Sequence, residues 1–124
     1  TWVTCNTKTH IARVIDTMAY AAQCNITDLA IRMEDVEFYK CTVRGIFNKC
    51  FFQGTTVRSS YVKSCDFLRC NINKSKVQNS KITYCKTNSS LFVKVNGESN
   101  RDISDDTVLI DCTFEKIYKK DDAS

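Results

Sequence analysis

The chain has few of the residues on which most catalytic sites depend. Its 124 residues include one histidine, His10, and three glycines. A single histidine offers one possible base for a Cys-His nucleophile pair, and three glycines do not make a glycine-rich phosphate loop. The carboxylates Asp102, Asp105 and Asp106 suggest a glycosidase pair or a calcium site in principle, but they fall in a polar stretch typical of a mobile loop. We therefore expect no enzyme activity and no cofactor.

The sequence also lacks a long apolar run. A helix that crosses a bilayer takes about 18 apolar residues or more, and no run approaches that length. The N-terminus has neither the charged nor the apolar region of a signal peptide. We expect one soluble domain, either a mature secreted chain or a piece of a longer protein.

Cysteine is abundant, but not at metal-binding spacing. The eight cysteines include no C-x-x-C pair, so we expect no metal site. Small cysteine-rich domains belong mainly to oxidising compartments. Glycosylation sequons begin at Asn25, Asn73 and Asn88, which agrees with a secretory route. These features predict an extracellular or vesicle-lumenal location.

Apolar residues recur at every fifth position, a period that fits neither a helix nor a half-buried strand. The apolar centres are Phe47, Phe52, Val57, Val62, Phe67, Ile72, Val77 and Ile82. A small residue stands two positions before each centre: Gly45, Cys50, Thr55, Ser60, Cys65, Cys70, Ser75 and Ser80. This alternation predicts short extended sides, each followed by a tight corner, with both residue types pointing inward. Four such sides would close a square coil of twenty residues, and stacked coils would form an all-β solenoid, a quadrilateral β-helix.

The rest of the chain is expected to extend or cover this solenoid as one domain. We assign residues 1–30 to an N-terminal cap, 31–95 to the coils, 96–106 to an acidic loop, 107–118 to a returning side and 119–124 to a tail. A short capping helix is indicated by apolar residues at helical spacing, namely Ile11, Val14, Ile15 and Met18. One residue is missing from the repeat at a corner near Arg44.

A twenty-residue coil predicts which cysteines are neighbours. Cys50 would lie beside Cys70, and Cys65 beside Cys85, one turn apart. Two disulfides are one interpretation, but a strand spacing separates β-carbons by more than the roughly 3.8 Å of a relaxed disulfide. This favours a ladder of buried free thiols. The disulfide candidates are the cysteines outside the ladder: Cys5, Cys24, Cys41 and Cys112.

Three segments carry a resemblance to a known family: Asn48–Phe52 (NKCFF), Lys63–Phe67 (KSCDF) and Asp111–Phe114 (DCTF). They resemble units of pentapeptide-repeat proteins, and in particular the large lumenal loop of synaptic vesicle glycoprotein 2 transporters. The likeness covers roughly residues 31–93 and 107–118. It departs from that loop in having Val or Ile at many centres and a basic exterior.

The resemblance implies a right-handed quadrilateral β-helix and a rigid, glycosylated, non-catalytic module of a membrane transporter. In vertebrates that module serves as a receptor for botulinum neurotoxins through an exposed strand edge and a nearby glycan. Here the candidate edge is Thr107 to Phe114, with Val108, Leu109 and Cys112 between them, or the side that ends at Val95.

Basic residues dominate the repeat and suggest an alternative partner. Between residues 40 and 97 they outnumber acids by 11 to one, and the members that we assign to a basic surface are Arg58, Lys63, Arg69, Lys74, Lys76 and Lys81. A solvated surface with no partner is the simplest interpretation. The functional alternative is a secreted adhesion or effector domain that binds anionic glycans. We expect no nucleic acid partner, because the aromatic residues point inward, and membrane contact only through flanking segments. A β-helix lyase would require a cleft lined by acids.

Overall fold

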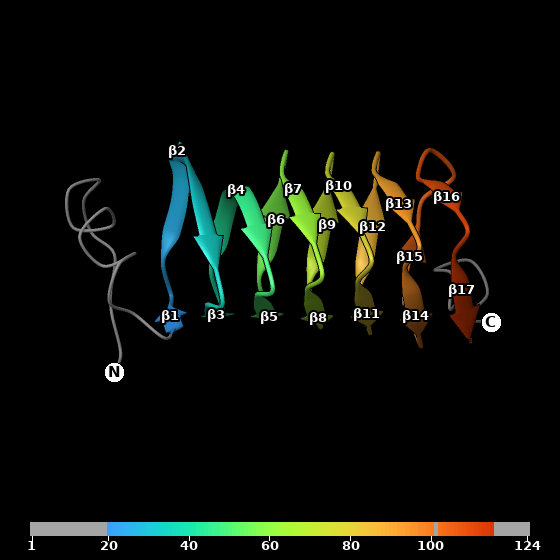
Figure 1. The fold of residues 1–124 in the computed structure, drawn as a ribbon, viewed down its shortest axis with the longest axis horizontal. Coiled ribbons are helices and arrows are strands. Elements are labelled where there is room, and N and C mark those ends of the chain that lie inside the picture. Colours follow the sequence, from blue (N-terminus) through green and yellow to red (C-terminus); the bar gives the residue numbers. More distant parts are fainter. Residues whose placement is uncertain (1–19, 101, 116–124) are drawn as a thin grey trace.

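The computed structural model describes residues 20–100 and 102–115. Over this range the chain forms an all-β parallel solenoid of about 6 turns, seen from the side in Figure 1. Most strands have three residues, and consecutive strands along the chain lie on different faces. The predicted β-solenoid architecture is confirmed.

Three rows of strands form the faces of the solenoid. Face 1 consists of β1 (Tyr20–Ala22), β3 (Glu37–Tyr39), β5 (Phe51–Gln53), β8 (Asp66–Leu68), β11 (Lys81–Thr83), β14 (Asn96–Glu98) and β17 (Thr113–Glu115). Face 2 consists of β6 (Thr56–Arg58), β9 (Asn71–Asn73), β12 (Lys86–Asn88) and β15 (Asp102–Ile103). Face 3 consists of β7 (Tyr61–Lys63), β10 (Lys76–Gln78), β13 (Leu91–Val93) and β16 (Val108–Ile110). The longer strands β2 (Asn25–Glu34) and β4 (Thr42–Asn48) join faces 2 and 3 into one sheet.

Strand pairing sets the size of the coil. Phe52 pairs with Phe67 and Val57 with Ile72, so one regular turn takes 67 − 52 = 15 residues. The coil therefore has three sides of five residues, and the twenty-residue, four-sided coil that we predicted is wrong. The five-residue side is confirmed, because every centre from Phe47 to Ile82 is buried. The alternation of large and small residues describes one side and carries no information about how many sides close a turn. The right-handed sense of the coil stays a prediction.

Each side ends in a corner residue two positions after its centre. These residues have left-handed backbone, with φ between 48 and 58°: Gln23, Asp35, Lys40, Lys49, Gly54, Ser59, Ser64, Arg69, Lys74, Asn79, Tyr84, Ser89, Lys94, Ser99 and Asp111. A side chain in this region costs about 1 to 2 kcal/mol. The corner amide gains a partner in return, as Ser59 N–H donates to the Asn73 carbonyl of the next coil at 2.9 Å.

Aromatic centres stack through the early coils. On face 1 the ring of Phe52 lies 5.1 Å from Phe38 and 4.7 Å from Phe67, nearly parallel to both. Phe47, the face 3 centre of an adjoining side, meets Phe52 edge-on at 5.1 Å. Such pairs add about 0.5 to 1.5 kcal/mol beyond the burial of their area. The core is therefore a continuous column along the solenoid axis.

The ends of the solenoid differ from our assignment. The first described residues already form strands, since β1 and the start of β2 lie within residues 20–30, which we gave to the cap. The four residues of the predicted capping helix lie outside the described residues. The acidic loop is shorter than predicted, because β14 and β15 fall within 96–106. The repeat is one residue short near Arg44 because β4 runs unbroken from Thr42 to Asn48. The strand continues through the position at which a corner would otherwise turn the chain.

Candidate functional site

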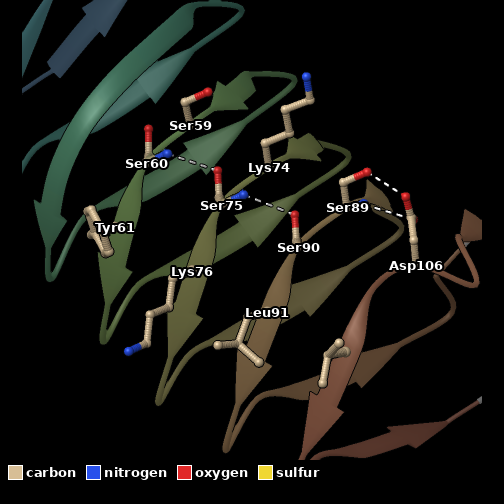
Figure 2. Close-up of a pocket in the computed structure, with 11 residues that line it drawn as sticks. Ser59, Ser60, Tyr61, Lys74, Ser75, Lys76, Ser89, Ser90, Leu91 and Asp106 are labelled. Carbon is tan, nitrogen blue, oxygen red and sulfur yellow. Dashed lines mark hydrogen bonds between the residues drawn. The ribbon is translucent and has the colours of Figure 1, made fainter.

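Small polar residues form hydrogen-bonded columns inside the corners. In the column between faces 2 and 3, Ser60 N–H donates to Ser75 Oγ at 3.1 Å and Ser75 N–H donates to Ser90 Oγ at 3.2 Å (Figure 2). Each hydroxyl in turn donates to the carbonyl two residues earlier, just before the corner, as Ser75 Oγ does to Asn73 at 2.9 Å. The small residue before each centre therefore satisfies a buried amide of the preceding coil.

Cysteines occupy the same structural position as these serines. Cys50 N–H donates to Cys65 Sγ at 3.3 Å, fifteen residues along, and Cys65 N–H donates to Ser80 Oγ at 3.1 Å. Cys70 and Cys85 lie in another column, where Cys85 N–H donates to the Asn100 side chain at 3.1 Å. The pairs that we predicted, Cys50 with Cys70 and Cys65 with Cys85, are therefore wrong, because they assumed twenty residues per turn.

No disulfide joins any two of the seven described cysteines, and all of them except Cys112 are buried. Cys24 and Cys41 are neighbours in one column, where Cys24 N–H donates to Cys41 Sγ at 3.4 Å. Cys112 lies near the other end of the solenoid, where its thiol donates to Phe92 O at 3.4 Å, so it is far from both. The remaining disulfide candidate, Cys5, lies outside the described residues.

The pKa of the inner thiols shifts in both directions. Side-chain hydrogen bonds with Cys65 and Cys70 lower the pKa of Cys50 and Cys85 respectively, whereas the pKa of Cys41, Cys65 and Cys70 is raised. Desolvation raises the pKa of Cys41 to about 11. The side-chain hydrogen bond with Cys50, followed by burial, raises the pKa of Cys65, and burial is the main cause of a raised pKa at Cys70. A protonated thiol can donate to a carbonyl, as Cys65 Sγ does to Lys63 O at 3.3 Å. The raised pKa of Cys41, Cys65 and Cys70 therefore means that these three thiols serve structure and provide no reactive thiolate.

The three carboxylates of the acidic stretch do not converge on one site. Asp102 lines a shallow groove on face 2, while Asp106 lines the groove between faces 2 and 3, and Asp105 is exposed in the turn before β16. Asp106 accepts hydrogen bonds from the Ser104 hydroxyl and, at 3.0 Å, from the Ser89 amide. The Ser104 hydroxyl contributes most to lowering the pKa of Asp106 to about 2, followed by the Ser89 hydroxyl, which also donates to Asp106, and then by the Ser89 amide. Asp106 is thus an ionised acceptor that closes the corner where the regular coil stops.

Figure 2 shows the groove that follows the corner between faces 2 and 3. The serine column forms its floor, and its walls include Ser59, Lys74, Ser89 and Asp106 on one side and Tyr61, Lys76, Leu91 and Val108 on the other. Lys74 and Lys76 project from opposite walls and point away from each other. The hydroxyls of the floor are already hydrogen-bonded to carbonyls of the backbone. The groove therefore offers an aromatic ring and two outward ammonium groups to a ligand that lies along the solenoid axis.

The basic residues are spread over the whole circumference. Arg58 is on face 2, Lys63 on face 3 and Lys81 on face 1, while Arg69 and Lys74 occupy two different corners. Arg69 lies 5.7 Å from the centre of the Tyr84 ring in the next coil. The structure thus surrounds the solenoid with positive charge and gathers it on no single face.

The sequon asparagines point outward on face 2. Asn73 is half-buried and Asn88 exposed, and the two pair directly on adjacent strands β9 and β12. Asn25 is also exposed, at the start of β2. All three therefore lie where a glycan can leave the surface.

The last strand of face 3 carries an apolar edge. Three consecutive residues of β16 are exposed: Val108 at 53%, Leu109 at 41% and Ile110 at 46%. Val108 and Ile110 pair with Leu91 and Val93 of β13, which extends the apolar surface by one coil. Leu109 occupies a centre position and would be buried if another coil covered it. The sequence signal for this surface is the pair of apolar residues, Val108 and Ile110, on either side of the centre Leu109. Most sides have polar residues at the two positions that flank the centre.

The backbone of this edge is also open. Val108 N–H donates to Ser90 O at 2.8 Å, and Ile110 O accepts from Lys94 N–H at 2.9 Å, so both groups point toward the preceding coil. In a parallel ladder the residue between them points the other way. The N–H and C=O of Leu109 therefore face a side on which no strand lies within 20–100 and 102–115. The edge predicted from the sequence is therefore narrowed to β16. Of the other residues of that predicted edge, Thr107 is buried and Cys112 and Phe114 are half-buried. Val95, which ends the alternative side, is fully buried.

Comparisons with known proteins do not assign this chain. No protein-family model matches it, and no curated protein sequence is significantly similar. No group of three or more metal-ligating side chains occurs among the described residues. The same part of the chain contains no helix that is long and apolar enough to cross a membrane.

Proposed function

We propose that this chain is a non-catalytic recognition domain whose β16 edge pairs with a strand of another protein. The observation that carries the proposal is the run of three exposed apolar residues on a strand that ends its sheet. An exposed apolar edge ordinarily invites aggregation, and natural sheets protect such edges with charge, proline or cover. An edge left open in this way is suited to strand addition, in which backbone bonds give affinity and side-chain pockets give specificity.

The proposed setting is the lumenal or extracellular side of a transporter-like membrane protein, with glycans on the sequon asparagines. Three observations support it. The sequon asparagines are accessible on face 2, and the first and last described strands, β1 and β17, both belong to face 1, as suits a loop tethered at both ends. An open strand edge is also the element through which the resemblance to the synaptic vesicle glycoprotein 2 loop implies recognition. The three-sided coil departs from the four-sided coil of that family, so the proposal depends mainly on the edge.

A peptide-display experiment tests the edge. We would select extended peptides against the full chain and measure their binding to the double variant Val108→Lys/Ile110→Lys. Tyr61→Ser is the matched control. Tyr61 is also exposed and lies on face 3, but its strand β7 is separated from the edge strand β16 by β10 and β13. The proposal predicts that selected peptides bind the control and fail to bind the edge variant. Equal binding to both variants would rule out β16 as the recognition surface.

An anionic glycan in the groove of Figure 2 is the second candidate function. The observation in its favour is the combination of Lys74 on one wall of the groove with Lys76 and Tyr61 on the other. Charge-driven binding weakens steeply with ionic strength, whereas edge pairing does not. Heparin binding that is lost in Lys74→Ser/Lys76→Ser, and retained in the edge variant, would support this alternative.

A further inference from the structure

The charge of the solenoid changes sign along its axis. From Lys40 to Gly97 the chain has 11 basic residues and one acid, whereas from Glu98 to Glu115 it has six acids and one basic residue. The second segment forms the terminal strands beside the open edge, drawn in orange and red in Figure 1. The open end is therefore an acidic end on a basic body.

Two of these acids stand at the ends of the edge strand. Asp106 lies two residues before β16 and is ionised at neutral pH, as its hydrogen bonds lower its pKa to about 2. Asp111 follows Ile110 directly and is an exposed corner residue. Lys94 occupies the same corner one coil back and offsets part of the charge of Asp111. No basic residue lies between Asp102 and Glu115.

A strand added to β16 would meet a fixed pattern of neighbours. Its central residue would lie over Leu109 and continue the buried face 3 column, and its two adjacent residues would lie beside Val108 and Ile110. In the added strand, the residues that flank these three would approach Asp106 at one end of β16 and Asp111 at the other. We infer that the partner is an extended protein segment of about three apolar residues flanked by lysine or arginine, the width being that of one side of the coil. This inference rests on the proposed edge recognition.

Charge also argues against a second copy of the chain as the occupant. If two β16 strands paired in antiparallel register about Leu109, Asp111 of one copy would lie near Asp106 and Thr107 of the other. Like charges placed opposite each other across two strands are destabilising. A basic segment reverses the sign of this interaction at both ends of the edge.

Synthetic peptides test the inference on the full chain. The probes are Lys-Lys-Val-Leu-Val-Lys-Lys, the same core flanked by serine, the same core flanked by glutamate, and Lys-Lys-Pro-Pro-Pro-Lys-Lys, which keeps the charge but has no central N–H groups. We expect the lysine-flanked peptide to bind about tenfold tighter than the serine-flanked one at low salt, and the advantage to shrink at high salt. The proline peptide should not bind. Asp111→Asn should reduce the advantage about two- to threefold, while Asp66→Asn, which removes the one acid of the basic body, should not change it.

The outcomes separate this inference from the proposed function. If peptides with all three flanks bind equally and Leu109→Lys abolishes binding, edge recognition stands and the basic partner is wrong. If none binds, or the proline peptide binds as well as the others, both ideas fail. Self-association of the wild-type chain in sedimentation, lost in Leu109→Lys, would identify a second copy as the occupant and overturn the inference.

Discussion

Replacement of Cys65 by valine should destabilise the solenoid, whereas replacement by serine should not. The thiol of Cys65 accepts the Cys50 amide at 3.3 Å and donates to the Lys63 carbonyl at 3.3 Å. Serine can form both bonds, as Ser75 does at the equivalent corner between faces 2 and 3, with distances of 3.1 and 2.9 Å. Valine fills a similar volume but has no acceptor, so the Cys50 amide would stay buried without a partner.

The size of the effect follows from two opposing contributions. A buried amide without a partner costs about 1 to 3 kcal/mol. The extra carbon of valine, once buried, offsets about 0.8 kcal/mol of that cost. The expected net loss for Cys65→Val is therefore about 0.2 to 2.2 kcal/mol. The middle of that range corresponds to a fall in melting temperature of roughly 5 °C for a domain of this size.

Urea unfolding followed by far-UV circular dichroism measures this difference. Cys65→Ser is the matched control, because it removes the sulfur and keeps the hydrogen bonds. The reasoning is refuted if Cys65→Val is as stable as Cys65→Ser. That result would mean that the small residues of the columns act only through their volume.

Four further predictions concern other parts of the solenoid. A Cβ on Gly97 would clash with the ring of Phe114 and with the side-chain amide of Asn100. Gly97→Ala should therefore cost about 1 to 3 kcal/mol by thermal denaturation, and this cost should become smaller in a Phe114→Ala background, where only the Asn100 contact is left. Lys49 is a corner residue with a φ of 55°, a left-handed conformation that glycine adopts without strain. Lys49→Gly should therefore leave the free energy of unfolding unchanged or raise it by up to about 1 kcal/mol. A clear loss of stability in the same assay would show that the corner is not strained. The lowered pKa of Asp106 should add stability above pH 4 that is lost between about pH 4 and 2. When stability is measured against pH, Asp106→Asn should lack this loss. Identical pH profiles for the wild-type chain and the variant would contradict the prediction. Brief alkylation of the native chain, read by peptide mass spectrometry, should label Cys112 ahead of the six buried cysteines, and rapid labelling of Cys65 would contradict its burial.

The sequence predicts the single side of the coil better than the closed turn. The alternation of large and small residues follows from one side and its corner, and so the buried centres from Phe47 to Ile82 were predictable. The number of sides depends on the angle at each corner, which the side-chain pattern does not encode. The wrong number then placed Cys50 beside Cys70 instead of Cys65, although free buried thiols were correctly favoured over disulfides among the described residues.

The candidate site was predictable only in outline. The sequence predicts a returning side at residues 107–118 and a candidate edge from Thr107 to Phe114. The exposure of that edge depends on which coil lies last, which is a property of the whole stack. The apolar neighbours Val108 and Ile110 were visible in the sequence. Their meaning became clear once pairing placed them on the outer surface of a terminal strand.

Amide hydrogen exchange at Leu109 tests the central claim most directly. The Leu109 N–H points away from β13, whereas the Phe92 N–H lies within the paired sheet and faces β16. With the lysine-flanked peptide absent, Leu109 should exchange far faster than Phe92, and its exchange should slow markedly when the peptide is added. Slow exchange at Leu109 in the free chain, or fast exchange that the bound peptide leaves unchanged, would contradict recognition through this edge.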